Sequence, residues 1–472
     1  MSDPRARTRR RPRTSPADPA REAAFDVLAA IRGKDSYANL VLPPLLRSRG
    51  ITGRDAAFAT ELVSGTVRRE GTYDAVIAAR LDRQLRQVDP AVLDALRLGA
   101  HQILAMRVPA HAAVGTTVDL VRAKVGHGPA GFVNAVLRKV AAHDLAGWVR
   151  RVAPDPASDP VGFASVAFSH PRWVVSALAG ALSDGPGGAS GELDDLLAAD
   201  NEPPKVTLVA WPGLSSVEEL VAAGGTASER SPYAVQLGSG DPGGIPAVAE
   251  RRAGVQDEGS QLVALALAGA PLEGPDVRWL DMCAGPGGKS ALLAALAGER
   301  GARLLAAERL EHRASLVASA TRRAGEGLLG VVVADGTRPA WRDGGFDRVL
   351  VDAPCSGLGA LRRRPEARWR RQSSDLDQLV PLQRALLTSA LAAVRPGGVV
   401  GYVTCSPVLA ETSGVVAAVL DGRDDVRLED ATSLFPGLED LAGPLPGTVQ
   451  LWPHRHGTDA MFLALLRRSP AH

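Results

Sequence analysis

Apolar residues recur at helical spacing through the first third of the chain. Three stretches show it most clearly: Ala24, Phe25, Leu28 and Ile31; Val92, Leu93, Leu96, Ala100, Ile103 and Leu104; and Phe132, Val133, Val136, Leu137 and Val140. Asp89-Pro90 is typical of a helix start, with an N-cap followed by proline at the first helical position. Residues 21–148 are therefore predicted to form an all-α domain of about five to seven helices.

The pattern changes twice further along the chain. Residues 149–250 are rich in Pro, Gly, Ser and Asp, and they contain one clear strand candidate, Val206 to Ala210, and a short helix candidate, Val217 to Ala223. We predict a small α+β connector domain for this segment. From residue 251 to 472 short apolar runs alternate with helical stretches, and the strand-like runs are Val277 to Leu280, Arg303 to Ala307, Leu329 to Ala334, Arg348 to Val351, Val399 to Thr404, Thr448 to Trp452 and Met461 to Leu466. This alternation predicts a Rossmann-like α/β domain with a doubly wound sheet.

Composition limits the class of protein. The chain has 472 residues, 45% of them hydrophobic, which is enough for two or three domains with their own cores. No apolar run reaches the length of a membrane span, and no hydrophobic segment follows the arginine-rich N-terminus. The formal charge is only +2. The arginines of residues 1–20 predict a disordered tail, which is either an arm that strengthens RNA binding or a plain solvated tail.

The chain has three cysteines, Cys283, Cys355 and Cys405. Their number is odd and their spacing matches neither a disulfide framework nor a metal site, so we expect a reducing, cytoplasmic location and no metal ion.

A glycine-rich turn joins the first predicted strand of the α/β domain to a helix rich in Ala and Leu. It contains Gly285, Gly287 and Gly288 and is followed by Lys289-Ser290. A P-loop would require glycine at position 283, where this chain has cysteine, and the glycine spacing also differs from a dinucleotide fingerprint. A turn that merely joins strand to helix is the structural alternative. Otherwise the turn brings backbone amides to a small ligand without needing a phosphate.

Four acids close four of the predicted strands: Asp281, Glu308, Asp335 and Asp352. The carboxyl ends of parallel strands form the edge where open α/β sheets bind ligands, so a ribose partner at Glu308 and an adenine partner at Asp335 are expected. Strand-end aspartates also cap helices, which is the alternative for each one. Together with the glycine turn, the acids favour S-adenosylmethionine as the cofactor. Lys289 then meets the cofactor carboxylate or forms a buried salt bridge.

Cys355 and Cys405 each follow a predicted strand, in Asp352-Ala-Pro-Cys-Ser and Thr404-Cys-Ser. C5 of cytosine is a poor nucleophile, and a thiolate that adds to C6 activates it for methylation. Asp352 beside the base would hold N3 and the amino group. Spacing alone does not say which cysteine attacks. The Asn-Pro-Pro-Tyr type of motif that serves N-methylation is absent.

A basic stretch follows the Cys355 segment. It contains Trp369 and six arginines, namely Arg362, Arg363, Arg364, Arg368, Arg370 and Arg371. We expect it to grip an RNA backbone or stack on a base, and a solvated helix face is the alternative.

Two family resemblances follow from these residues. Asp55 to Arg69 and Gly131 to Lys139 resemble the RNA-binding NusB-like domain, which implies Arg68, Arg69, Arg138 and Lys139 as phosphate contacts. The C-terminal block resembles the Sun/Fmu family of RNA cytosine-C5 methyltransferases, and a NusB-like domain in front of it points to the RsmB subgroup, which modifies 16S ribosomal RNA. The matching motifs are Val255-Gln-Asp257 with Ser260-Gln261, Asp281 to Lys289, Asp335-Gly336, Asp352 to Gly357, Arg363 to Glu366 with Trp369, and Thr404-Cys-Ser406.

The second resemblance implies roles for individual residues. Cys405 is implied as the nucleophile and Cys355 as the group that assists release of the methylated base, with Asp352 as the third catalytic residue. The implied cofactor contacts are Cys283, Ala284, Gly285, Pro286, Gly287, Gly288, Lys289, Glu308, Asp335 and Asp352. Glu308 departs from the aspartate usual in the family. A non-catalytic RNA-binding or ribosome-assembly factor, a transfer RNA methyltransferase and a DNA methyltransferase that attacks through Cys355 are the alternative functions.

Overall fold

The computed structural model describes residues 18–33, 37–183, 191–238 and 240–470. The predicted arginine-rich tail therefore lies almost wholly outside the described residues. The chain divides into two compact units, the first ending at His170 and the second beginning at Pro171. The connector predicted at 149–250 stays a prediction, since this boundary falls inside it.

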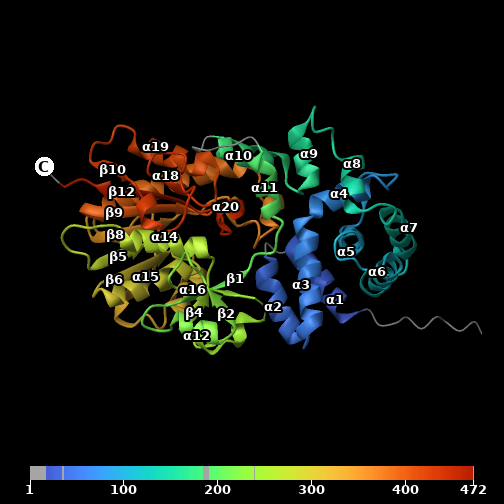
Figure 1. The fold of residues 1–472 in the computed structure, drawn as a ribbon, viewed down its shortest axis with the longest axis horizontal. Helices are drawn as coiled ribbons and strands as arrows, with labels where there is room; N and C mark the ends of the chain where they lie inside the picture. Colours follow the sequence, from blue (N-terminus) through green and yellow to red (C-terminus); the bar gives the residue numbers. More distant parts are fainter. Residues whose placement is uncertain (1–17, 34–36, 184–190, 239, 471–472) are drawn as a thin grey trace, which may run out of the picture. The chain divides into compact units, whose positions relative to one another are not determined.

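The first unit is helical, as predicted (Figure 1). Its helices are α1 (Pro19–Gly33), α2 (Ala38–Ser48), α3 (Gly53–Arg68), α4 (Glu70–Ala78), α5 (Pro90–Leu104), α6 (Ala110–Lys124), α7 (Ala130–Val140), α8 (Leu145–Val152) and α9 (Pro160–Ala167). Asp89 caps α5 by accepting hydrogen bonds from the amides of Ala91 and Val92. The apolar stripes of these helices form one buried core that includes Tyr73 and Trp148.

The second unit contains two sheets. The smaller one is antiparallel, with the order β2-β3-β1-β4, and consists of β1 (Val206–Ala210), β2 (Gly225–Ala227), β3 (Ala234–Leu237) and β4 (Ala253–Val255). Only β1 was predicted from the sequence. The accompanying helices are α10 (Arg172–Ser183), α11 (Glu192–Ala199), α12 (Val217–Ala222) and α13 (Pro246–Ala249).

The larger sheet has eight strands. Its order is β10-β12-β9-β8-β5-β6-β7, and β11 pairs with β12 off this path. The bounds are β5 (Arg278–Asp281), β6 (Arg303–Glu308), β7 (Leu328–Val333), β8 (Phe346–Asp352), β9 (Val394–Thr404), β10 (Val426–Glu429), β11 (Val449–Gln450) and β12 (Phe462–Arg468). The run β7-β6-β5-β8-β9 is parallel, as predicted, whereas β12 and β10 are antiparallel. The strand order reverses between β5 and β8, and ligands bind at the carboxyl edge of such a switch point.

Helices cover both faces of this sheet because its strands alternate their side chains. Trp279 of β5 packs into the core that contains α14 (Glu258–Gly269) and α15 (Gly288–Glu299). Its neighbour Leu280 packs into the opposite core, with α18 (Leu376–Ala393) and α19 (Ser413–Leu420). The remaining helices of this unit are α16 (Glu311–Ala320), α17 (Ala367–Arg370) and α20 (Pro453–His456).

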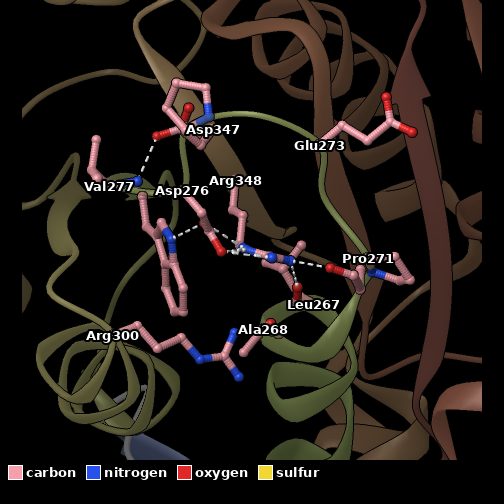
Figure 2. A network of polar contacts seen from close by, with 12 residues as sticks. Leu267, Ala268, Pro271, Glu273, Asp276, Val277, Arg300, Asp347 and Arg348 are labelled. Carbon is pink, nitrogen blue, oxygen red and sulfur yellow. Dashed lines mark hydrogen bonds and ion pairs between the residues drawn. The ribbon is translucent and has the colours of Figure 1, made fainter.

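A polar network lies at the edge of the sheet where the parallel strands begin, opposite their carboxyl ends (Figure 2). Arg348 at the start of β8 is 3% exposed, forms an ion pair with Asp276 at 2.8 Å and donates hydrogen bonds to the carbonyls of Leu267 and Ala270 at the end of α14. Asp347 accepts hydrogen bonds from the Val277 and Arg278 amides. The guanidinium satisfies carbonyls that a helix end leaves without partners. This edge therefore has a structural role.

Candidate active site

The glycine turn between β5 and α15 lies against the end of β6. A Cβ at Gly285 would overlap Oε2 of Glu308, and Gly287 has φ +113° with Ala320 2.7 Å from the place of its missing Cβ. Only glycine allows both the close approach and the left-handed backbone. Within the turn, the Ala284 amide donates to the Ala307 carbonyl at 3.0 Å. The turn is therefore fixed in position at the carboxyl edge of the sheet.

Asp281 anchors the turn from within. It is 1% exposed, accepts a hydrogen bond from the Ser290 hydroxyl at 2.6 Å and one from the Cys283 amide at 3.3 Å. Burial raises its pKa to about 7, opposed by the Ser290 hydrogen bond. Both of its oxygens bind the ends of the turn, so Asp281 positions the backbone.

Glu308 lies where the sequence placed it, at the last position of β6. It is 5% exposed, and its carboxylate accepts hydrogen bonds from the Gly285 amide at 3.1 Å and the Leu310 amide at 3.0 Å. Arg313 lies 3.7 Å from it and donates to the Gly285 carbonyl at 2.7 Å. A carboxylate has about four acceptor sites. Two amides leave Glu308 with acceptor capacity for ligand hydroxyls.

Asp335 lies two residues beyond β7 and forms a capped turn. Its Oδ1 accepts hydrogen bonds from the Thr337 amide at 2.9 Å and the Thr337 hydroxyl at 2.7 Å, and these bonds lower its pKa. The capping alternative is therefore present, and it engages one of the two carboxylate oxygens.

Lys289 and Asp352 form an ion pair beside the cysteines. Nζ of Lys289 lies 2.8 Å from Oδ2 of Asp352, and the two side chains are 11% and 26% exposed. Burial opposes the charge of Lys289, but the Asp352 carboxylate raises the pKa of this lysine above its usual value. The salt bridge considered as an alternative for Lys289 is thus observed. It joins the glycine turn to the end of β8.

The two cysteines that follow β8 and β9 are in contact. Sγ of Cys355 lies 3.5 Å from Sγ of Cys405, and both thiols are free. β8 and β9 are parallel neighbours, with Asp352 opposite Val403, so the segments that follow them, with Cys355 three residues past the end of β8 and Cys405 one residue past the end of β9, meet at the same edge. The Gly359 amide donates to the Cys405 carbonyl at 2.9 Å, and the Ala460 amide donates to the Gly359 carbonyl at 2.8 Å.

The surroundings shift the pKa values of the two thiols in opposite directions. Contact with Cys355 lowers the pKa of Cys405 against the effect of burial, and Lys289 lowers it further. Contact with Cys405 and burial raise the pKa of Cys355 well above its usual value, and the Glu411 charge adds to this. Two thiols this close do not both ionise. Cys405, on the side of the ammonium, therefore ionises first, and Cys355 keeps its proton.

Cys283, the third cysteine, lies in the glycine turn. Burial raises its pKa well above the usual value, and the charges of Asp281, Asp352 and Glu308 raise it further. Three of the four predicted acids thus gather around this turn. A thiol in such an environment stays protonated, so Cys283 is unsuited to nucleophilic attack.

The arginine stretch after Cys355 was interpreted wrongly in part. Arg368 is fully buried and donates hydrogen bonds to the Asn201 side chain at 2.8 Å and the Asp200 carbonyl at 3.1 Å. Arg362 is 9% exposed and donates to the Gly457 carbonyl at 3.0 Å. Arg363 forms an ion pair with Asp459. The stretch binds protein groups from distant parts of the chain, because a charge that is buried requires a partner. These three arginines form neither a solvated helix face nor a continuous RNA grip, whereas Arg364 is exposed.

Among the phosphate contacts expected in the first unit, one is excluded by burial. Arg68 is 6% exposed and lies 3.7 Å from Glu61. Arg138 and Lys139, in contrast, lie exposed in the last turn of α7. Only the latter two keep their guanidinium and ammonium groups at the surface, and Arg69 is intermediate.

Sequence reasoning missed two buried acids near the cysteines. Glu411 and Asp459 are both fully buried. Burial raises the pKa of Asp459 to about 6, and the charge of Asp257 raises it further. In the sequence, each of them is a single acid within an apolar or turn segment. This pattern does not distinguish an acid in a buried network from an acid on a surface loop.

Comparison with known proteins places the chain in a family. The profile of the 16S rRNA methyltransferase RsmB/F family matches residues 268–467, and that of the NusB family matches residues 18–142. The ribosomal RNA small subunit methyltransferase B of Pseudomonas putida is 32% identical over 94% of this chain and 98% of its own length. This chain belongs to the ribosomal RNA small subunit methyltransferase B family. It is an S-adenosylmethionine-dependent ribosomal RNA methyltransferase, as the sequence motifs predicted.

Two further relatives and one solved structure are also similar to this chain. A putative methyltransferase of Mycobacterium tuberculosis is 55% identical over 97% of this chain and 98% of its own length. A probable ribosomal RNA small subunit methyltransferase B of Synechocystis is 32% identical over 95% and 99%. Among solved structures, NSun6 of Pyrococcus horikoshii aligns with 63% of this chain and 98% of its own at a TM-score of 0.53 and 18% identity, which shows the fold. Within the described ranges, no helix combines the length and apolarity that a membrane crossing requires.

Proposed function

We propose that this methyltransferase transfers a methyl group to C5 of a cytosine in 16S ribosomal RNA, with Cys405 as the nucleophile and Cys355 assisting release. The observation that supports it best is the pair of unequal thiols 3.5 Å apart at the ends of β8 and β9. Methylation of a nucleophilic nitrogen or oxygen needs no thiol, whereas C5 of cytosine needs one. The relatives named ribosomal RNA small subunit methyltransferase B support the substrate class.

The glycine turn and the strand-end acids fit the cofactor. Residues 283–289 would hold its methionine part, Glu308 would accept hydrogen bonds from the ribose, and Asp335 would meet the adenine with its second oxygen. The cofactor supplies an electrophilic methyl group on a sulfonium. An approach this close to the backbone is possible because Gly285 and Gly287 carry no Cβ.

Cys405 starts the reaction as a thiolate. Its sulfur bonds to C6 of the pyrimidine, the electrons of the 5,6 double bond move toward C5, and C5 then takes the methyl group. Water accepts the C5 proton, the electrons of that C–H bond restore the 5,6 double bond, and the sulfur leaves C6 as a thiolate. A thiolate is suited to both steps, being a strong nucleophile and a good leaving group.

Lys289 and Asp352 orient the base. Asp352 accepts a hydrogen bond from the exocyclic amino group of the cytosine, beside N3, and Lys289, 2.8 Å from this carboxylate, places positive charge where the ring gains electron density. Charge fixed in advance at such a site lowers the barrier without reorganisation. A flipped base would enter between this pair and Cys405.

Cys355 acts through its proton. Its S–H donates to the sulfur of Cys405 and stabilises the thiolate as it leaves the methylated base. Without this donor, departure of the thiolate becomes harder and the covalent adduct persists.

The first unit supplies RNA affinity in this proposal. Arg138 and Lys139 present their charges at the end of α7, and phosphate contacts of this kind add affinity without base specificity. A cytoplasmic location stays a prediction.

Methyl transfer to small-subunit RNA from a deletion strain tests the proposal. The wild-type protein should introduce 5-methylcytosine, detected by bisulfite sequencing, and Cys405→Ala should introduce none. Cys355→Ala should accumulate a protein–RNA adduct that survives denaturing electrophoresis.

Both variants should bind labelled cofactor as the wild type does, which controls for folding. Normal methylation by Cys405→Ala, or clean product release by Cys355→Ala, would contradict the assigned roles. Transfer RNA and duplex DNA serve as competing substrates, and preferential methylation of either would overturn the 16S assignment.

A further inference from the structure

A buried carboxylate connects the two cysteine loops. Oε2 of Glu411 accepts hydrogen bonds from the hydroxyls of Ser356 at 2.5 Å and Ser406 at 2.6 Å, and these are the residues that directly follow Cys355 and Cys405. The two hydroxyls also lie 2.9 Å from each other. One side chain thus contacts both loops at the position next to each thiol.

The second carboxylate oxygen holds the same region from the other side. Oε1 of Glu411 accepts hydrogen bonds from the Ser356 amide at 2.8 Å and from Gln383 at 3.0 Å, and Gln383 also donates to the Pro354 carbonyl at 2.8 Å. The Tyr402 hydroxyl donates to the backbone carbonyl of Glu411 at 2.7 Å. Each contact fixes Glu411, Pro354 or Ser356 against β9 and α18.

A fully buried carboxylate without a cation is costly, and within the described residues the groups that donate hydrogen bonds to the Glu411 carboxylate are neutral. Its four hydrogen bonds come from one amide, two hydroxyls and one side-chain amide, and they fill its acceptor sites. A buried carboxylate with this energetic cost is expected where the distance between other groups must be fixed. Here the distance is the one between Sγ of Cys355 and Sγ of Cys405.

We infer that Glu411 is a positioning residue that clamps the two cysteine loops together and thereby sets the contact between Cys355 and Cys405. The inference rests on the proposed function, since the contact matters for release of the methylated base. Glu411 does not touch the base in this assignment. It acts through Ser356 and Ser406, and its charge helps Cys355 to keep its proton.

The test compares Glu411→Ala with the conservative Glu411→Gln. Alanine removes every hydrogen bond of the Glu411 side chain, so the loops separate and the thiols lose contact. Glutamine keeps an acceptor for the Ser356 amide, and its amide group can donate to the two hydroxyls. The ratio of covalent RNA adduct to released product should rise roughly tenfold in the alanine variant, the effect of about one lost buried hydrogen bond, and return toward the wild-type ratio with glutamine.

A second readout does not depend on RNA. The pH dependence of alkylation of each cysteine, followed by peptide mass spectrometry, should show Cys405 reacting at lower pH than Cys355 in the wild type. In Glu411→Ala the two profiles should converge, because the thiols no longer share a proton. Ser406→Ala, a smaller change, should move both readouts in the same direction and covers the case in which the alanine variant at 411 does not fold.

Asp347→Asn is the matched control. Asp347 is a carboxylate 3% exposed that also accepts backbone amides, but it lies at the opposite edge of the sheet. It should lower thermal stability and leave both the adduct ratio and the alkylation profiles unchanged. Wild-type values of both readouts in Glu411→Ala and Ser406→Ala would overturn the inference. Absence of methylation and of any adduct in the wild type would instead refute the proposed function, with the alkylation profiles still reporting on the clamp.

Discussion

Gly285→Ala tests how the cofactor loop is built. A Cβ at this position would overlap Oε2 of Glu308 and come within 2.9 Å of the Arg313 guanidinium. The glutamate side chain is the flexible member of this contact, so its carboxylate would move away and lose the hydrogen bond from the Gly285 amide, which is 3.1 Å long. The expected result is a folded protein in which Glu308, the proposed ribose partner, is displaced.

The size of the effect follows from the contacts. A hydrogen bond to a charged group contributes roughly 1.5–3 kcal/mol. If Glu308 meets the ribose out of position and one such bond is lost, cofactor binding should weaken roughly 10- to 150-fold. Isothermal titration calorimetry with S-adenosylhomocysteine measures this directly, alongside the melting temperature of each variant.

The control separates this effect from a general effect of adding a methyl group. Gly269→Ala makes the same change at the end of α14, where nothing lies within 4 Å of the added Cβ, and should leave affinity unchanged. A double-mutant cycle with Glu308→Ala is the sharpest check. If Gly285→Ala acts through Glu308, it should cost little in the Glu308→Ala background, and an equal loss in both backgrounds would refute the reasoning.

Three further predictions concern single charges. Lys289→Met removes the ammonium that lowers the pKa of Cys405, and because the thiolate exists above that pKa, the acid limb of the kcat/KM profile should move to higher pH; an unmoved limb would argue against this electrostatic role. Arg138→Ala should reduce the slope of log K against log salt for RNA binding by about one while cofactor affinity stays constant. Arg368→Ala should lower the free energy of unfolding by about 3 kcal/mol in urea titrations, because Asn201 loses a buried donor and Asp200 a compensating charge; a surface-like loss below about 0.5 kcal/mol would contradict its burial.

Local sequence determined the elements and their chemistry. The apolar spacing of residues 21–148 specified helices, because one face of each had to be buried. The alternation after residue 251 specified strands that end at Asp281, Glu308 and Asp352, and the two cysteine motifs limited the chemistry to a few reactions. These features depend on residues close in sequence, so they can be read without coordinates. β2, β3 and β4 were missed because short strands in a small sheet are stabilised mainly by their partners.

Tertiary structure decided which charges are exposed and which groups meet. Arg138 and Arg368 look alike in the sequence, but one is exposed on α7 and the other fully buried against Asn201. The contact between Cys355 and Cys405 joins segments 50 residues apart, and Glu411 acquires its contacts only once β8 and β9 pair. Burial and pairing determine the pKa of each group, and both depend on chain segments that are distant in the sequence.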